Sequence, residues 1–219
     1  MEPLAIPTLV INGNSDGTEN ADRMHRVHDL CQRLGLNCTR TPAQFVTGNA
    51  IERASACGVK PPNEHKAGLW LAHREAWKQV ANAATPHLIM EDDVDMPSLK
   101  SDDETRERLF EYLHTSAERG EDLSFVSHLG TAYRLSPAGA KHLLSEVGEC
   151  EISRFAVDHY MMNFVKDNSP VQDERKLHGS FAVDWSEPAF GDHQVCGHGI
   201  GCSGILPQTT TAYSYRLRA

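Results

Sequence analysis

Residues 88–95 read Leu88-Ile89-Met90-Glu91-Asp92-Asp93-Val94-Asp95, so three apolar side chains lead directly into four carboxylates within five positions. Pro86 and Pro97 bracket the run. The apolar half is typical of a short buried strand, and the acidic half then lies where that strand leaves its sheet. Open α/β sheets bind their ligands at the carboxyl ends of the strands. This stretch therefore predicts an α/β fold and also the position of its functional site.

The four carboxylates indicate a cation site. Successive strand side chains point to opposite faces, so we expect Glu91, Asp93 and Asp95 on one side and Asp92 on the other. Carboxylates gathered on one side repel one another unless a cation or protons compensate. Mg²⁺ or Mn²⁺ is the natural partner, because these ions are usually held by one or two carboxylates together with substrate phosphates. A solvated acidic turn is the alternative interpretation.

The composition of the 219 residues argues against several classes of protein. The formal net charge of −9 disfavours a nucleic-acid-binding surface, which needs a basic stripe. The N-terminus lacks the basic and apolar regions of a secretory signal, and no apolar run reaches the ~20 residues of a membrane helix. The cysteines are scattered, so we expect reduced thiols and a cytoplasmic location. They are Cys31, Cys38, Cys57, Cys150, Cys196 and Cys202.

The N-terminal part of the chain is expected to form a β-α-β unit. Residues 6–11 are apolar and β-branched and end at Asn12-Gly13, which predicts a buried strand followed by a turn. Apolar residues at helical spacing predict a helix over 21–34 that is stopped by Gly35. Residues 36–40 are a weak second strand, which completes the unit.

The rest of the chain alternates helices and strands without a repeat or a domain linker. Residues 45–63 carry glycines and a Pro61-Pro62 pair and are expected to form a long, partly irregular segment. We expect helices over 66–84, 104–118, 137–147 and 156–166, and strands over 123–126, 130–135 and 181–183. Residues from 185 onward are rich in Gly and His and are expected to form loop. The sequence therefore predicts one α/β domain covering residues 1–219.

A set of short motifs occurs in this chain in the same order as in one known family. They are Ile11-Asn12, Arg23-Met24, Gly68, Ala72-His73, Trp77, Glu91 to Val94, Tyr133, Ser136-Pro137-Ala138-Gly139-Ala140-Lys141-His142-Leu143-Leu144, Val157-Asp158, Pro188, Gln194 and Ser203. With these motifs the chain resembles glycosyltransferase family 25. That family holds bacterial lipopolysaccharide galactosyltransferases and the procollagen galactosyltransferase domains. The family's Glu-Asp-Asp-Val is intact here, whereas its Ser-His pair is replaced by Ala72-His73.

The resemblance implies a single GT-A-like, Rossmann-type nucleotide-sugar-binding domain with a mostly parallel central sheet flanked by helices. It also implies an inverting transfer of a hexose, most often galactose, from a UDP-sugar to a hydroxyl of a glycan or glycoconjugate acceptor. Mn²⁺ or Mg²⁺ is the implied cofactor.

The resemblance implies roles for residues at the donor side. Ile11 and Asn12 would lie beside the uridine, and Arg23 would stand near them at the start of the first helix. Asp92 could reach the ribose, whereas Glu91 could either contact the donor or be buried as a hydrogen-bonded support. For His73, on the inward face of its helix, a core histidine bonded to a carbonyl and a donor contact are both open interpretations.

Metal ligands are expected from the acidic stretch and from the tail. Asp93 closes the Glu-Asp-Asp signature and is the first ligand expected, and Asp95 is the second. A single histidine of the tail, His193 or His198, would complete the shell. A tetrahedral zinc site of His193, Cys196, His198 and Cys202 is the alternative, although its spacing matches no paired Cys-x-x-Cys pattern.

An inverting transfer also needs a base that takes the acceptor proton. Asp158 is the candidate, because the neighbouring Phe155 and Val157 suggest partly buried surroundings. The alternative is that Asp158 only occupies the first turn of a helix, where the dipole favours a carboxylate.

Two other functions remain open from the sequence. A metal-dependent phosphohydrolase would use the same acidic strand end. Its active site would also require further Asp or His residues at the ends of other strands. A sugar-nucleotide or glycan-binding module that has lost turnover would keep the fold, and the altered Ala72-His73 motif is the reason to consider it.

Overall fold

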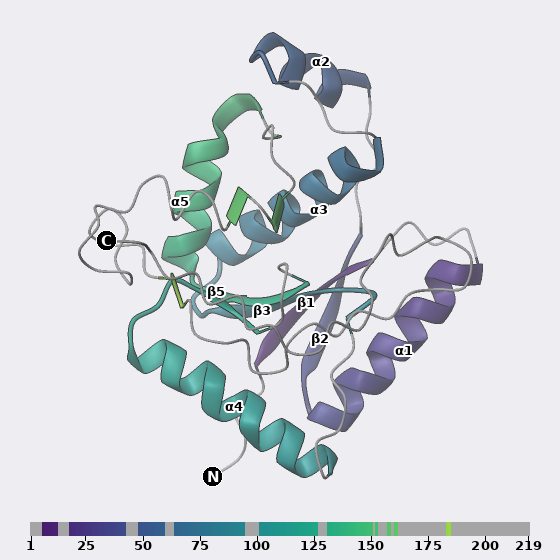
Figure 1. Ribbon diagram of the computed structural model, residues 1–219, viewed down its shortest axis with the longest axis vertical. Helices are drawn as coiled ribbons and strands as arrows, with labels where there is room; N and C mark the ends of the chain where they lie inside the picture. Colours follow the sequence, from purple (N-terminus) through teal and green to yellow (C-terminus); the bar gives the residue numbers. More distant parts are fainter. Residues whose placement is uncertain are drawn as a thin grey trace, which may run out of the picture.

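A computed structural model describes most of the N-terminal two thirds of the chain and little of the remainder. The described residues are 6–12, 18–42, 48–59, 64–94, 101–126, 131–150, 152, 157–158, 160–161 and 183–184. Within these ranges the chain forms a central sheet with helices on both faces (Figure 1). None of the helices described combines the length and hydrophobicity that a membrane span requires.

The sheet has six strands in the order β2-β1-β3-β5-β4-β6. Their bounds are Pro7–Asn12 for β1, Asn37–Pro42 for β2, His87–Glu91 for β3, Leu123–Phe125 for β4, Ala132–Leu135 for β5 and Val183–Asp184 for β6. β1 lies between β2 and β3 and is parallel to both, whereas β5 is antiparallel to β3 and to β4. The sheet is therefore mixed, and the prediction of a mostly parallel sheet is not confirmed.

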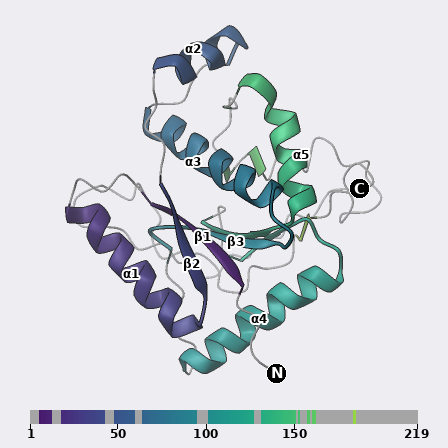
Figure 2. The same cartoon turned by 180° about the vertical axis from the view of Figure 1, so that it is seen from behind.

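Helices cover the sheet in two layers. They are α1 (Thr18–Leu34), α2 (Gly48–Ala56), α3 (Glu64–Ala81), α4 (Asp102–Glu118), α5 (Pro137–Val147) and a short 3-10 helix η2 (Gly148–Cys150). α1 and α4 lie together on one face, and α3 and α5 lie on the other, as the front and back views both show (Figures 1 and 2). We call these the α1 face and the α3 face.

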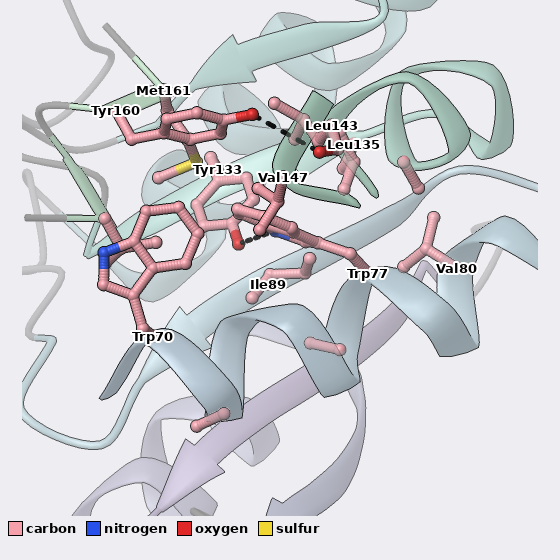
Figure 3. Close-up of a cluster of buried hydrophobic side chains, with 14 of the residues drawn as sticks. Trp70, Trp77, Val80, Ile89, Tyr133, Leu135, Leu143, Val147, Tyr160 and Met161 are labelled. Carbon is pink, nitrogen blue, oxygen red and sulfur yellow. Dashed lines mark hydrogen bonds between the residues drawn. The ribbon is translucent and has the colours of Figure 1, made fainter. Parts of the chain in front are cut away.

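Strand alternation explains why the molecule has two cores. In β1, Val10 packs on the α1 face while Leu9 and Ile11 pack on the α3 face. In β3, Met90 faces α1 and Ile89 faces α3, because successive side chains of a strand point to opposite faces of the sheet. The core on the α3 face contains two tryptophans, two tyrosines and aliphatic residues of α5 (Figure 3).

Two helix ends occur at residues that favour a helix end in the sequence. Gly35 adopts φ +65° after α1, and the amides of Gly35 and Leu36 bond to the carbonyls of Gln32 and Cys31, which is a Schellman motif. Ser136 caps α5 by accepting a hydrogen bond from the amide of Gly139 at 2.9 Å. Both ends confirm the predicted boundaries.

Some sequence-based expectations were wrong or fall outside the described residues. Residues 45–63 were expected to be partly irregular, and α2 in the centre of this segment is a helix that was not predicted. Of the helix predicted over 156–166, only residues 157–158 and 160–161 are described, and all four are helical. β6 covers only the last residue of the strand predicted over 181–183. The predicted loop from 185 onward lies outside the described residues.

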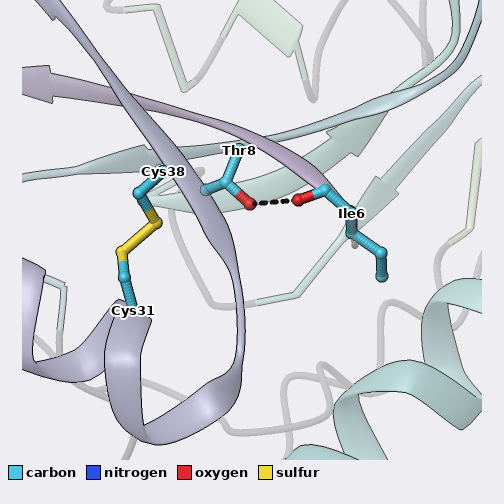
Figure 4. Close-up of a disulfide and its surroundings, with 4 residues drawn as sticks. All are labelled: Ile6, Thr8, Cys31 and Cys38. Atoms are coloured by element: carbon cyan, nitrogen blue, oxygen red, sulfur yellow. Dashed lines mark hydrogen bonds between the residues drawn. A yellow bond between two sulfur atoms is a disulfide. The ribbon is translucent and has the colours of Figure 1, made fainter. Parts of the chain in front are cut away.

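Four cysteines form disulfides, so the prediction of free thiols is wrong for them. Cys31 at the end of α1 is bonded to Cys38 in β2 with a Cα–Cα distance of 6.2 Å (Figure 4). The tight turn at Gly35 brings these two residues together. Cys57, directly after α2, is bonded to Cys150 in η2. Because such bonds are typical of oxidising compartments, the cytoplasmic prediction loses the argument on which it rested.

Candidate functional site

The candidate site lies where β1 and β3 end side by side. Ile11 of β1 is paired with Glu91 of β3, so Asn12 and Asp92 follow at the same level. β3 ends at Glu91, and Asp92 and Asp93 form a turn in which the amide of Val94 bonds to the carbonyl of Glu91. The strict alternation that we expected to continue to Asp95 therefore stops at Asp92, since a turn replaces the strand.

On the α1 face, Asp92 is held by two side chains from the N-terminal β-α unit. Asn12 donates its side-chain amide to Oδ2 of Asp92 at 2.7 Å. The guanidinium of Arg23, in α1, lies 3.3 Å from Oδ1 of the same carboxylate. All three residues were predicted from the sequence as donor-site residues, and the structure brings them into one cluster. Asp92 is only 9% exposed, so burial strengthens both contacts.

On the α3 face, Glu91 is held by a histidine that is fully buried. Nε2 of His73 lies 3.2 Å from Oε1 of Glu91, and Nδ1 lies 2.8 Å from the hydroxyl of Tyr133. The hydroxyl of Tyr133 also accepts a hydrogen bond from the indole of Trp77 at 2.8 Å. The sequence had suggested a core histidine bonded to a carbonyl, but its partners are a hydroxyl and a carboxylate.

Tyr133 and Trp77 take part in this cluster through contacts that sequence reasoning did not foresee. Burial raises the pKa of Tyr133 well above its usual value; the hydrogen bond from Trp77 opposes that shift, and the charge of Glu91 adds to it. Tyr133 therefore remains a neutral hydroxyl at physiological pH. The spacing of His73 and Trp77 by four residues places them on one face of the helix, but it does not predict their common partner Tyr133.

The remaining predicted residues have different placements. Ile11 is a buried core residue on the α3 face. Asp93 is half-buried in the turn after β3. Asp158 is half-buried and helical, and its neighbour Val157 packs into the core on the α3 face. Asp95 and His193 lie outside the described residues, as do His198 and the cysteines of the alternative zinc site.

Of the expected metal ligands, Asp93 is among the described residues. Within the described ranges, no group of three His, Cys, Asp or Glu side chains is arranged to hold a metal ion. Two of the expected ligands, Asp95 and His193, are not among those residues. Because Mg²⁺ or Mn²⁺ needs only one or two carboxylates plus substrate phosphates, Asp93 together with Asp95 remains chemically suitable.

Comparison with known proteins does not assign the chain to a family. No family model and no curated protein matches it. Among solved structures, it is similar to one titled "crystal structure of a glycosyltransferase involved in the glycosylation of the major capsid of PBCV-1". The identity is 12%, the match covers 79% of this chain and 85% of the other, and the TM-score is 0.47. So low a likeness does not establish a shared function, and membership of glycosyltransferase family 25 is not shown.

Proposed function

We propose that this protein is a metal-dependent glycosyltransferase that moves a hexose, with galactose the first candidate, from a UDP-sugar to a hydroxyl of a glycan acceptor. One observation carries the proposal. The end of β3 presents two consecutive carboxylates, Glu91 and Asp92, each braced by a side chain from a different face of the sheet. Carboxylates held in this way accept hydrogen bonds from hydroxyl groups, of which a nucleotide sugar has several.

The surroundings of Asp92 suit the nucleotide half of such a donor. α1 follows β1 in the chain, so the N-terminus of this helix lies at the carboxyl edge of the sheet, where its amides favour phosphate. Arg23 adds a positive charge one turn further along α1, with its side chain 19% exposed. We assign the ribose hydroxyls to Asp92 and the diphosphate to the start of α1.

The metal would be held by Asp93 and Asp95, with His193 as a further ligand. Asp93 lies in the turn that follows β3, and Asp95 comes two positions later in the sequence. Bound there, Mn²⁺ or Mg²⁺ would neutralise charge on the departing UDP. The protein's own part would be to hold Asp93 in the turn directly after Asp92, next to the edge where Asn12 and Arg23 contact Asp92.

The base that takes the acceptor proton would be Asp158. The helical segment that carries it packs on α3, because Tyr160 lies edge-on to Trp70 with ring centroids 4.9 Å apart. Asp158 therefore lies on the same face of the sheet as Glu91, whereas Asp92 lies on the other. An inverting displacement needs the base and the leaving UDP on opposite sides of the anomeric carbon, and the proposal assigns them to separate places, UDP to the Asp92 side and the base to Asp158.

The alternative function is a module that binds the sugar nucleotide but does not turn it over. The argument for it rested on Ala72, which stands where the family has Ser. Ala72 is fully buried in the core on the α3 face. A hydroxyl at this position would face the core and not a ligand, so its absence does not speak against catalysis.

A melting screen tests the proposal. The wild-type protein is heated with UDP-galactose, UDP-glucose or GDP-mannose, each with and without Mn²⁺. A UDP-sugar with Mn²⁺ should raise the melting temperature, since any ligand selective for the native state stabilises it. Asp93→Asn should lose the Mn²⁺-dependent part of the shift, whereas Asp103→Asn, an exposed acid in α4, should keep it. No shift with any UDP-sugar, or an unchanged shift in Asp93→Asn, would overturn the assignment.

A further inference from the structure

Four polar groups form a continuous line from the core to the candidate site. The line runs from the indole of Trp77 to the hydroxyl of Tyr133, then through the ring of His73 to the carboxylate of Glu91, with separations of 2.8, 2.8 and 3.2 Å. The first three residues are fully buried, and the Glu91 side chain is 16% exposed. Figure 3 shows the first of these bonds deep among the core side chains.

The fold dictates why these groups meet. Tyr133 in β5 is paired with Ile89 in β3, and Glu91 is two residues further along β3, so all three side chains point to the α3 face. His73 and Trp77 lie one turn apart on α3, which packs on this face, and their side chains therefore reach Tyr133 and Glu91. The rings of His73 and Tyr133 are also stacked, with centroids 5.8 Å apart.

The line has a direction because one end can only donate. An indole N–H has no acceptor capacity, so the oxygen of Tyr133 must accept from Trp77. The proton of Tyr133 is then available for Nδ1 of His73, and a neutral ring that accepts at Nδ1 carries its own proton on Nε2. That N–H donates to the Glu91 carboxylate. The other neutral tautomer would turn a lone pair of Nε2 toward the carboxylate and would direct two donors at the Tyr133 oxygen.

We propose that Trp77, Tyr133 and His73 are positioning residues that fix His73 as the Nε2–H tautomer and thereby orient the Glu91 carboxylate as an acceptor for a hydroxyl of the sugar nucleotide. This inference rests on the proposed function. A carboxylate accepts about four hydrogen bonds, and His73 uses one of them. Glu91 thus retains capacity for a ligand hydroxyl while its orientation is set from the buried side. None of the three positioning residues needs to touch the ligand.

The tautomer can be tested without any ligand. Nitrogen-15 NMR of the histidine rings identifies which nitrogen carries the proton, and comparison with His73→Gln assigns the His73 signals. In wild type, Nε2 should be protonated and Nδ1 should be an acceptor. Tyr133→Phe removes the donor to Nδ1 and should change these signals. Tyr160→Phe is the matched control, because its hydroxyl also lies in this core but bonds to the carbonyl of Leu143.

A second arm measures donor affinity and turnover. His73→Leu removes the N–H that holds Glu91 and should weaken UDP-sugar affinity about tenfold to a hundredfold, as expected for loss of a hydrogen bond to a charged group. His73→Gln can present an amide N–H in its place and should recover part of the loss. Tyr133→Phe should raise KM for the donor, whereas Tyr160→Phe should not.

The outcomes separate the inference from the proposed function. A wild-type His73 protonated on Nδ1, or a His73 signal that responds equally to Tyr133→Phe and Tyr160→Phe, overturns the directed line. Equal donor affinities for His73→Leu and His73→Gln overturn the positioning role. Failure of the wild-type protein to bind any UDP-sugar overturns the proposed function, while the NMR result still decides the tautomer.

Discussion

The side-chain amide of Asn12 and the carboxylate of Asp92 share a buried hydrogen bond of 2.7 Å across 80 residues of sequence. The bond exists because β1 and β3 are parallel neighbours that end at the same level. It fixes Asp92 on the α1 face, while the preceding Glu91 is fixed on the α3 face by His73. One strand end therefore presents carboxylates on both faces of the sheet.

Replacing Asn12 by Asp should destabilise the protein. The change puts a second carboxylate against Asp92 in a buried position, where the amide now donates a hydrogen bond. We expect a loss of about 1–3 kcal/mol in the free energy of unfolding at pH 7. The loss should shrink at acid pH, when one of the two carboxyls is protonated. Denaturant titrations at the two pH values measure it. Asn82→Asp, at an exposed position, is the control and should change stability little.

Two buried tyrosines predict a loss of stability in alkali. Burial raises the pKa of Tyr133 and of Tyr160 well above the usual value of 10.0. Above pH 10 the unfolded chain therefore releases these protons while the folded chain keeps them. Their contribution is fully present below pH 10 and is lost as the pH rises further, by about 1.4 kcal/mol per pH unit for each tyrosine.

Unfolding free energies measured at several pH values above 10 test this expectation. Tyr160→Phe should make the decline shallower, because phenylalanine has no proton to lose. The expectation fails if the decline is the same in the variant, or if ultraviolet titration shows both tyrosines ionising near pH 10 in the folded protein.

The two disulfides should contribute unequally to stability. Cys57 and Cys150 are 93 residues apart, whereas Cys31 and Cys38 are 7 apart. Closing the longer loop removes more entropy from the unfolded chain. On that account, replacing Cys57 and Cys150 by Ser should cost about 4–5 kcal/mol, and replacing Cys31 and Cys38 about 2–3 kcal/mol. Each double variant serves as the control for the other in thermal and denaturant unfolding. An equal or reversed order would contradict the loop-length argument.

Asp158→Asn should separate chemistry from donor binding. The donor is assigned to the end of β3, while Asp158 belongs to a different segment that packs on α3. Loss of the base should lower the transfer rate by ~10² to 10⁴. UDP affinity with Mn²⁺, measured by calorimetry, should be unchanged, and the melting temperature should fall little. A near wild-type transfer rate would show that Asp158 is not the base and only occupies the start of a helix. A loss of UDP binding would show that Asp158 belongs to the donor site.

Periodicity and end signals in the sequence were sufficient to predict most of the fold. The apolar runs of β1 and β3 and the spacing of apolar residues in α1 and α3 mark their elements, and Gly35 and Ser136 mark helix ends. α2 was missed because Gly48, Gly58 and the prolines that follow it are typical of loops. The mixed sheet was missed because the direction of β5 depends on pairing with distant strands.

The candidate site was predicted in its residues but not in its connections. The acidic stretch and the motif residues indicated Asn12, Arg23, His73 and Asp92. The bond from His73 to Tyr133 joins residues 60 apart, and local spacing carries no information about such a contact. The disulfides were missed for a similar reason, since the cysteine spacing alone does not show which thiols the fold brings together.

Calorimetric titration of UDP-galactose in the presence of Mn²⁺ tests the central claim, that the end of β3 binds a sugar nucleotide. The titration compares wild type, Asp92→Asn and Asp103→Asn. Wild type and Asp103→Asn should bind with the same affinity, because Asp103 is exposed in α4 and its partner is Arg106. Asp92→Asn should bind about tenfold more weakly or worse, since it loses the charge that meets the donor. Absence of binding by wild type, or equal binding by wild type and Asp92→Asn, would contradict the account.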